Sequence, residues 1–155
     1  MWSFFLTALL VVVADQLSKL WIRSYAEGQT IFQAGFFQII HIQNTGAAFG
    51  LFQGQAFALA IISFVGVAVL LLYALLFSRR SPLLGNMLSR IAIGLILGGI
   101  IGNLIDRLRY LLHQLGGITD FISIGIWPAF NIADSAVVVG VIIFAYSLLP
   151  LARKH

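Results

Sequence analysis

Four aspartates are the residues best suited to chemistry, because they stand inside or beside long apolar stretches. They are Asp15, Asp106, Asp120 and Asp134. An Asp at the centre of a membrane helix costs roughly 2.5–3.5 kcal/mol, so such residues usually face a protein interior and usually have a function. Two facing carboxylates share one proton, because both cannot ionise easily. The ionised member can then deprotonate an attacking water while the protonated member donates to a carbonyl oxygen, as in aspartic proteases.

Asp120 and Asp134 are the stronger candidates for such a pair, since neither has a basic neighbour in the sequence. Asp15 lies four residues before Lys19, a spacing that places both on one helix face. We expect these two to form an ion pair, and Asp106 to pair with Arg107 or Arg109, in roles that support the fold. The alternative for all four aspartates is a set of ion pairs that only specifies helix packing.

Other mechanisms find little support in the sequence. The chain has no Cys, which excludes disulfides, thiolate zinc sites and a cysteine nucleophile. Its three histidines, His41, His113 and His155, lie outside the apolar stretches, and neither an HExxH nor a GxSxG motif occurs. We therefore expect no metal site and no cofactor.

The composition indicates an integral membrane protein. Of the 155 residues, 61% are hydrophobic and 9% are charged, against about 45–50% and about 25% in soluble domains. The net charge of +4 fits basic residues at membrane interfaces better than a nucleic-acid partner, which we set aside.

Four apolar stretches predict four transmembrane helices, and each is long enough to cross a bilayer. They span residues 4–21, 56–77, 91–112 and 132–151. We expect a mainly α-helical, single membrane-embedded domain over residues 1–155. A cleaved secretory signal is a poor alternative for the first stretch, since no Lys or Arg precedes it and Asp15 and Lys19 would interrupt it.

The connections between these helices differ in length. Residues 23–54 form the long first connection, in which the part from Gly35 to Gln43 reads as one or two short strands. An open sheet edge is not viable in hydrocarbon, so this segment should lie on the membrane surface or be covered by helices. The third connection, residues 113–131, is expected as a loop with a strand-like stretch at residues 118–126. The second helix has only Ser63 as a polar interior residue and is expected to pack only.

All four aspartates should lie near one membrane face, which the first connection also reaches. Along the third predicted helix, Gly94, Gly98 and Gly102 form small-xxx-small steps that allow another helix to approach. Four crossings place both termini on one side. If Lys19 and Arg107 are held by acidic partners, basic residues favour cytoplasmic termini by five to two.

Five motifs, read in order, resemble the lipoprotein signal peptidase family, also called signal peptidase II. They are residues 15–19 (DQLSK), 44–50 (NTGAAFG), 98–107 (GGIIGNLIDR), 119–121 (TDF) and 130–135 (FNIADS). They extend from the first predicted helix to the fourth. One departure is the short connection at residues 116–128, which compresses the separation of Asp120 and Asp134 relative to some members.

The resemblance implies an aspartyl endopeptidase of the bacterial inner membrane, with its active site near the outer leaflet. It would remove the signal peptide from prolipoproteins, cleaving before the diacylglyceryl-modified cysteine. Asp120 and Asp134 match the catalytic pair, and residues 23–54 match a surface β-cradle. The expected substrate-binding residues are Asn44, Gly46, Asn103, Arg107, Asn131 and Ala133, and the expected supporting residues are Asp15, Lys19 and Asp106.

The implied partners are lipid-modified prolipoproteins, membrane lipid and the cyclic peptide inhibitor globomycin, bound by a monomer. Two other functions remain open at this point. A small proton-coupled transporter could use Asp15, Asp106 and Asp134 as a relay, but it predicts titratable groups at mid-membrane depth with access from both sides. A non-catalytic assembly factor gives no reason for two unpaired aspartates.

Overall fold

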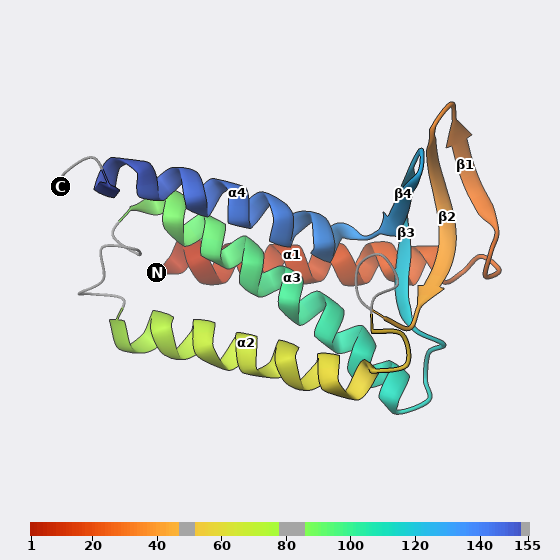
Figure 1. The fold of residues 1–155 in the computed structure, drawn as a ribbon, viewed down its shortest axis with the longest axis horizontal. Helices are drawn as coiled ribbons and strands as arrows, with labels where there is room; N and C mark the ends of the chain where they lie inside the picture. The colour runs from red at the N-terminus through yellow and green to blue at the C-terminus, as the bar shows by residue number, and fades with distance from the viewer. Residues whose placement is uncertain (47–51, 78–85, 153–155) are drawn as a thin grey trace.

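A bundle of α-helices with a small sheet at one end makes up the fold (Figure 1). The computed structural model describes residues 1–46, 52–77 and 86–152. The helices are α1 (Trp2–Ile22), α2 (Ala56–Phe77), α3 (Met87–Leu111) and α4 (Ile132–Ala152). The strands are β1 (Thr30–Ala34), β2 (Phe37–Asn44), β3 (Ile118–Ile124) and β4 (Trp127–Phe130). α1 begins and α4 ends at the end of the bundle that lies away from the sheet (Figure 1).

The helices have the length and exposure of membrane helices. Trp2–Ile22, Ala56–Leu76 and Met87–Leu111 are long and apolar enough to cross a membrane, and Ile132–Leu148 forms a shorter apolar helix within α4. Large apolar side chains are exposed along them, as expected for surfaces that face lipid. The predicted mainly α-helical membrane fold is therefore confirmed.

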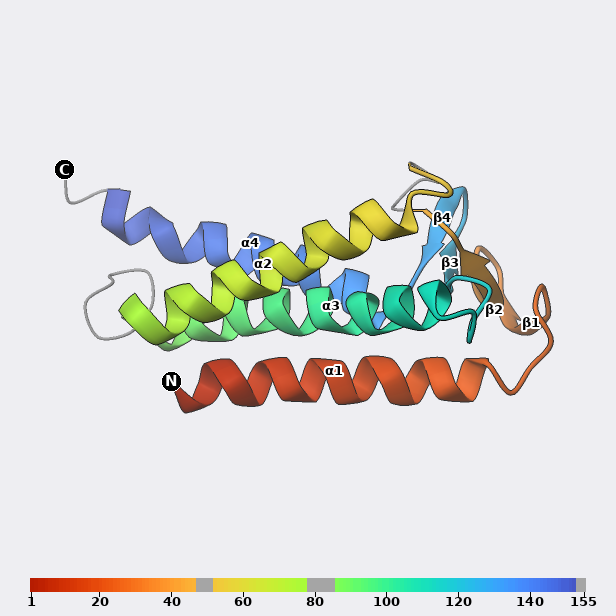
Figure 2. The same cartoon turned by 90° about the horizontal axis from the view of Figure 1, so that it is seen from below.

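α3 is the central helix, since it packs against α1, α2 and α4; Figure 2 shows α1 lying alongside it. Glycines permit these close approaches. A Cβ added at Gly98 would lie 2.7 Å from the carbonyl oxygen of Ala8 on α1. One added at Gly99 would overlap the carbonyl oxygen of Ala133 on α4. The predicted small-residue face is confirmed, and Gly99 adds a second face toward α4.

The third connection differs from the expected loop. Its residues form the β3–β4 hairpin, which adds to β1 and β2 in one antiparallel sheet of order β1-β2-β3-β4. Each hairpin turns at a glycine with positive φ, Gly35 (58°) and Gly125 (57°), as two-residue hairpin turns require. Pairing with β2 satisfies backbone groups of β3 that an isolated loop would leave to solvent. The sheet therefore brings together two segments that the sequence presents as separate.

α3 begins at Met87, four residues before the predicted start of the third helix. The Asn86 side chain accepts a hydrogen bond from the Ser89 backbone N–H at 2.7 Å and caps the helix. At its other end, His113 adopts a positive φ of 57° and stops the helix. Because α3 then ends near the sheet, its last turns reach the site.

Candidate active site

A buried ion-pair cluster at the sheet end of the bundle holds three helical residues. The Lys19 Nζ lies 2.8 Å from Asp15 Oδ2 and 3.3 Å from Asp106 Oδ2, and all three side chains are fully buried. The Asp15–Lys19 ion pair is as predicted. Buried charges are tolerated when their partners and hydrogen bonds are complete, so each further contact of this cluster fixes a neighbouring element.

Asp106 has different partners from those that the sequence suggested. Its Oδ1 lies 2.7 Å from Arg23 Nη2, and its Oδ2 accepts from the Thr119 backbone N–H at 3.2 Å. Arg23 Nε also donates to Thr119 Oγ1 at 2.8 Å. The predicted pairing with Arg107 or Arg109 was wrong, because within the described residues the ion pairs of Asp106 are with Lys19 and Arg23 of α1 and its C-terminal end. Arg107 in particular is adjacent to Asp106, and adjacent residues on a helix point in different directions. Asp106 thereby fastens the start of β3, directly before Asp120.

Asp15 holds the start of α4 in the same way that Asp106 holds the start of β3. Its Oδ1 accepts from the Ala133 backbone N–H at 3.0 Å, one of the N–H groups that the first turn of a helix leaves unpaired. Gln16 Nε2 donates to Asp15 Oδ2 at 3.0 Å and to the Gly102 carbonyl oxygen at 3.1 Å. Asp15 therefore sets the position of α4 one residue before Asp134.

Asn131 and Asp134 cap the start of α4 reciprocally. The Asn131 side-chain Oδ1 accepts from the Asp134 backbone N–H at 2.9 Å, and Asp134 Oδ2 accepts from the Asn131 backbone N–H at 3.1 Å. This is a capping box, in which an Asn and an Asp three residues apart satisfy each other's N–H groups. The Asp134 side chain is consequently held in one orientation at the helix start.

Three asparagine amides donate to the two candidate catalytic carboxylates. Asp120 Oδ2 accepts from Asn44 Nδ2 at 3.0 Å, and its Oδ1 accepts from Asn131 Nδ2 at 2.7 Å. Asp134 Oδ1 accepts from Asn103 Nδ2 at 2.7 Å. Asn131 therefore contacts both aspartates and connects β3 with α4.

The surroundings of Asp120 favour its protonated form. Burial is the main cause, followed by repulsion from Asp134, and together they raise the pKa of Asp120 from 3.8 to about 7. The hydrogen bonds from Asn44 and Asn131 act in the opposite direction. Asp120 lies in β3, outside the helices, and is 3% exposed. A carboxyl group with this pKa can hold a proton at neutral pH and release it.

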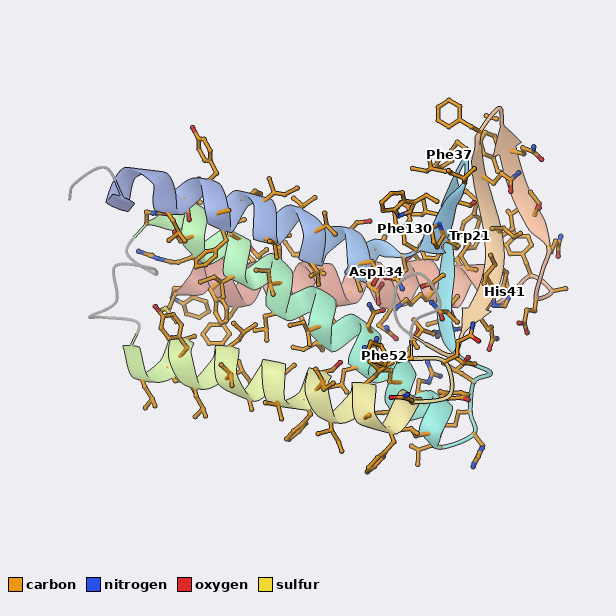
Figure 3. All side chains as sticks on the ribbon, viewed as in Figure 1. Trp21, Phe37, His41, Phe52, Phe130 and Asp134 are labelled. Atoms are coloured by element: carbon orange, nitrogen blue, oxygen red, sulfur yellow. The ribbon has the colours of Figure 1, made fainter. Side chains whose placement is uncertain are left out.

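Both aspartates line one cavity of about 580 Å³ between the sheet and the bundle. Figure 3 shows Asp134 and Phe130 together where α4 joins the sheet. Apolar side chains of β4 and α4 form much of the wall, and Arg107 lies on it with its Nη1 donating to Ser63 Oγ on α2 at 3.0 Å. Ser63 therefore orients a cation of the cavity, a role that the sequence reading of α2 missed.

The predicted substrate-binding residues divide into two groups. Asn44, Gly46, Asn103 and Arg107 line the cavity. Asn131 and Ala133 are both 0% exposed and lie behind its wall, where Ala133 packs against α3. Of the motif at residues 44–50, positions 47–50 lie outside the described residues.

Sequence reasoning missed three residues that hold the site, namely Gln16, Arg23 and Thr119. The Asn131–Asp134 capping box could have been found from its spacing, whereas the contacts of Arg23 and Thr119 depend on how β3 docks. Within the described residues, no group of three or more His, Cys, Asp or Glu side chains is arranged to hold a metal ion.

Fold and site together define a multi-pass helical membrane protein whose cavity carries a pair of aspartates. The sequence matches the signal peptidase (SPase) II family over residues 7–150, and the chain belongs to this family. It is 47% identical to the lipoprotein signal peptidase of Dehalococcoides mccartyi over 153 residues, which cover 98% of this chain and 91% of that one. The lipoprotein signal peptidase of Moorella thermoacetica is 43% identical over 98% of this chain and 96% of its own.

Solved structures of bacterial membrane enzymes share the fold. One has a TM-score of 0.83 at 30% identity and covers 97% of this chain and 89% of its own. A second has a TM-score of 0.78 at 31% identity, with 96% and 94% covered. The chain is therefore a bacterial multi-pass membrane peptidase, and the comparisons give the transporter alternative no support.

Proposed function

We propose that this protein is an aspartic endopeptidase that removes signal peptides from diacylglyceryl-modified prolipoproteins, with Asp120 and Asp134 as its catalytic pair. The observation that carries this proposal is that both carboxylates line one cavity while Asn131 contacts each of them. The names of the relatives support the substrate class, since they are lipoprotein signal peptidases.

One shared proton is enough for both steps of the reaction. The ionised carboxylate accepts a proton from water as the water oxygen bonds to the scissile carbonyl carbon, and the protonated carboxyl donates to the carbonyl oxygen. The resulting diol collapses when the C–N bond breaks. The leaving nitrogen takes the proton from one carboxyl group, and a diol hydroxyl returns its proton to the other carboxylate, which restores the singly protonated pair. The raised pKa of Asp120 suits it to hold the shared proton at neutral pH.

The cavity wall fits an extended peptide beside lipid. Val137, Val138 and Val139 supply an apolar surface on α4, and Arg107 and Asn44 supply polar groups for a peptide backbone. The apolar stretch of a signal peptide would lie among the helices while the two acyl chains of the modified cysteine remain in the bilayer. The same wall suits the cyclic peptide globomycin, which we expect to compete with substrate.

The site lies at the end of the bundle opposite the start of α1 (Figure 1). Lys19 and Arg23 form ion pairs with Asp106 at the site end. Arg90 lies in the first turn of α3, at the other end of the bundle. In the sequence, Arg79 and Arg80 follow α2 while Arg153 and Lys154 follow α4, and this distribution of basic residues favours a cytoplasmic position for that end. The active site then faces the outer leaflet of the inner membrane, in a single domain that works as a monomer.

Cleavage of a diacylglyceryl-modified prolipoprotein by the purified protein in detergent tests the proposal. Asp120→Asn and Asp134→Asn should each abolish cleavage while helical content is retained, because Asn cannot exchange the proton. Glu27→Gln is the matched control, since Glu27 is an exposed carboxylate before β1, and it should keep wild-type turnover. Turnover in both Asp variants would refute the assignment of the pair.

A further inference from the structure

Lys19 connects the buried ion-pair cluster to the candidate catalytic pair through one asparagine. Besides its two carboxylate partners, its Nζ donates to Asn103 Oδ1 at 3.1 Å. An ammonium has three donors and no acceptor, so Asp15, Asp106 and Asn103 use its full capacity. Lys19 itself is 0% exposed and does not line the cavity.

The side-chain amide of Asn103 has two possible orientations, which differ by the exchange of Oδ1 and Nδ2. Its hydrogen-bond partners determine which orientation it adopts. Its Oδ1 accepts from Lys19 Nζ and from Asn131 Nδ2 at 3.0 Å, while its Nδ2 donates to Asp134 Oδ1 at 2.7 Å. A reversed amide would place NH₂ against two donors and an oxygen against the Asp134 carboxylate. Asn131 is itself an amide, whereas the ammonium of Lys19 can only donate.

We propose that Lys19 is a positioning residue for peptide cleavage, which fixes the Asn103 amide so that its NH₂ group faces Asp134. This inference rests on the proposed function, since it gives meaning to Asn103 only if Asp134 takes part in the reaction. Preorganised donors of this kind act on a reacting carboxylate without reorganising during the reaction.

Through its two aspartate partners, Lys19 also connects the two elements that carry the candidate catalytic pair, helix α4 and strand β3. Asp15 holds the first turn of α4, which carries Asp134, and Asp106 holds the start of β3, which carries Asp120. A role confined to these ion pairs would be structural. The contact with Asn103 is the feature that distinguishes a positioning role, so the experiment must isolate the hydrogen-bond donor from the positive charge.

The test compares Lys19→Met with Lys19→Gln in the full-length protein, measuring kcat and KM on lipidated prolipoprotein. Both variants lose the charge, but only the glutamine keeps an N–H donor for Asn103 Oδ1. We expect Lys19→Met to lower kcat about 100-fold, since small misplacement of a reacting group has effects of this size, with KM little changed. Lys19→Gln should retain at least about tenfold more turnover than Lys19→Met.

Ser89→Ala is the matched control, because it removes a buried side-chain hydrogen bond, from Ser89 Oγ to Ser147 Oγ at 3.0 Å, in the first turn of α3 away from the cavity. It should lower thermal stability and leave kcat of the folded protein unchanged. Equal loss of kcat in Lys19→Met and Lys19→Gln, or an equal loss in Ser89→Ala, would overturn the positioning role. So would wild-type kcat in Lys19→Met.

A variant that keeps the lysine covers the case in which the Lys19 variants do not fold. Asn103→Asp still offers an oxygen to Lys19 but has no NH₂ group for Asp134, so it should fold and lose at least about tenfold in kcat. Wild-type kcat in Asn103→Asp would overturn the inference. Failure of the proposed function is a separate result, recognised by cleavage that persists in Asp120→Asn and Asp134→Asn.

Discussion

The buried aspartates of the site differ in the charge of the groups that surround them. Asp15 and Asp106 contact basic side chains and accept hydrogen bonds from backbone N–H groups. Among the described residues, the side-chain amides of Asn44 and Asn131 donate to Asp120, and Asp134 repels its charged form. Two carboxylates that serve the fold and two that can share a proton therefore stand within one connected network.

Activity should depend on pH through Asp120. Its pKa is raised to about 7, so Asp120 carries a proton below that pH and loses it above that pH. No proton is then available for the carbonyl oxygen, and kcat/KM should fall about tenfold per pH unit on the alkaline side. The measurement is kcat/KM from about pH 5 to about pH 9 at constant detergent and lipid. A profile that stays flat to the alkaline limit would contradict the assignment of the shared proton to Asp120.

Asp106→Asn should destabilise the protein at least as clearly as it slows turnover. The substitution leaves Lys19 and Arg23 with one carboxylate fewer in a buried cluster, and breaking a buried pair costs about 3–5 kcal/mol. Thermal unfolding in detergent, followed by circular dichroism, measures the effect beside kcat. A variant that is as stable as wild type but inactive would move Asp106 into the catalytic set and cast doubt on Asp120.

Close contacts of α3 with α1 and α4 determine where the first turn of α4, and with it Asp134, lies. Gly99 faces α4 beside Ala133, and Gly102 faces both Asp15 and Ala133. The first turn of α4 is therefore positioned by backbone contact as well as by the hydrogen bond from Ala133 to Asp15. Bulk at this contact would displace Asp134 together with the helix that carries it.

Gly99→Ala should destabilise the bundle, whereas Gly66→Ala should not. A Cβ at Gly99 would overlap the Ala133 carbonyl and lie 2.6 Å from Val137 Cγ2, while one at Gly66 meets only Ile100 Cδ1 at 3.7 Å. Overpacking against backbone costs about 1–3 kcal/mol, and Gly→Ala in an open helical position is neutral or gains up to about 1 kcal/mol. Melting temperatures and turnover of the two variants make the comparison. Equal effects would show that the α3–α4 contact does not constrain the site.

The molecule as a whole places its chemistry at one end of a membrane bundle. The sheet lies across that end (Figure 1). Most of the residues that line the cavity come from the sheet and from α3 and α4. Since the helices set the depth of the cavity in the bilayer, a substrate must present its scissile bond at the same depth.

Unlipidated prolipoprotein should be cleaved poorly or not at all, even when its signal helix inserts normally. The diacylglyceryl group contributes about 0.8 kcal/mol per buried CH₂ to membrane partitioning and keeps the cysteine at the interface. Without it, displacement by about 1 Å can cost about 100-fold in rate. Cleavage rates of lipidated and unlipidated substrate are compared in the same bilayer. Comparable rates would refute an account based on depth at the interface.

Sequence alone determined the features that depend on neighbours along one element. Composition and apolar length predicted the membrane helices, and a spacing of four residues predicted the Asp15–Lys19 ion pair. The Asn131–Asp134 capping box is equally local, and its pattern was present to be read. Helical periodicity reports such contacts directly, because it states which side chains share a face.

Tertiary structure decided the contacts between segments far apart in the chain. Asn44 and Asp120 are 76 positions apart, and their contact exists because the pairing of β2 with β3 sets Ile42 opposite Asp120 and Asn44 opposite Ile118. Lys19 and Asn103 are 84 positions apart and meet because glycines let α1 approach α3. A spacing along one element carries no information about the register or the approach distance of another, and these two quantities determine which groups surround Asp120 and Asp134.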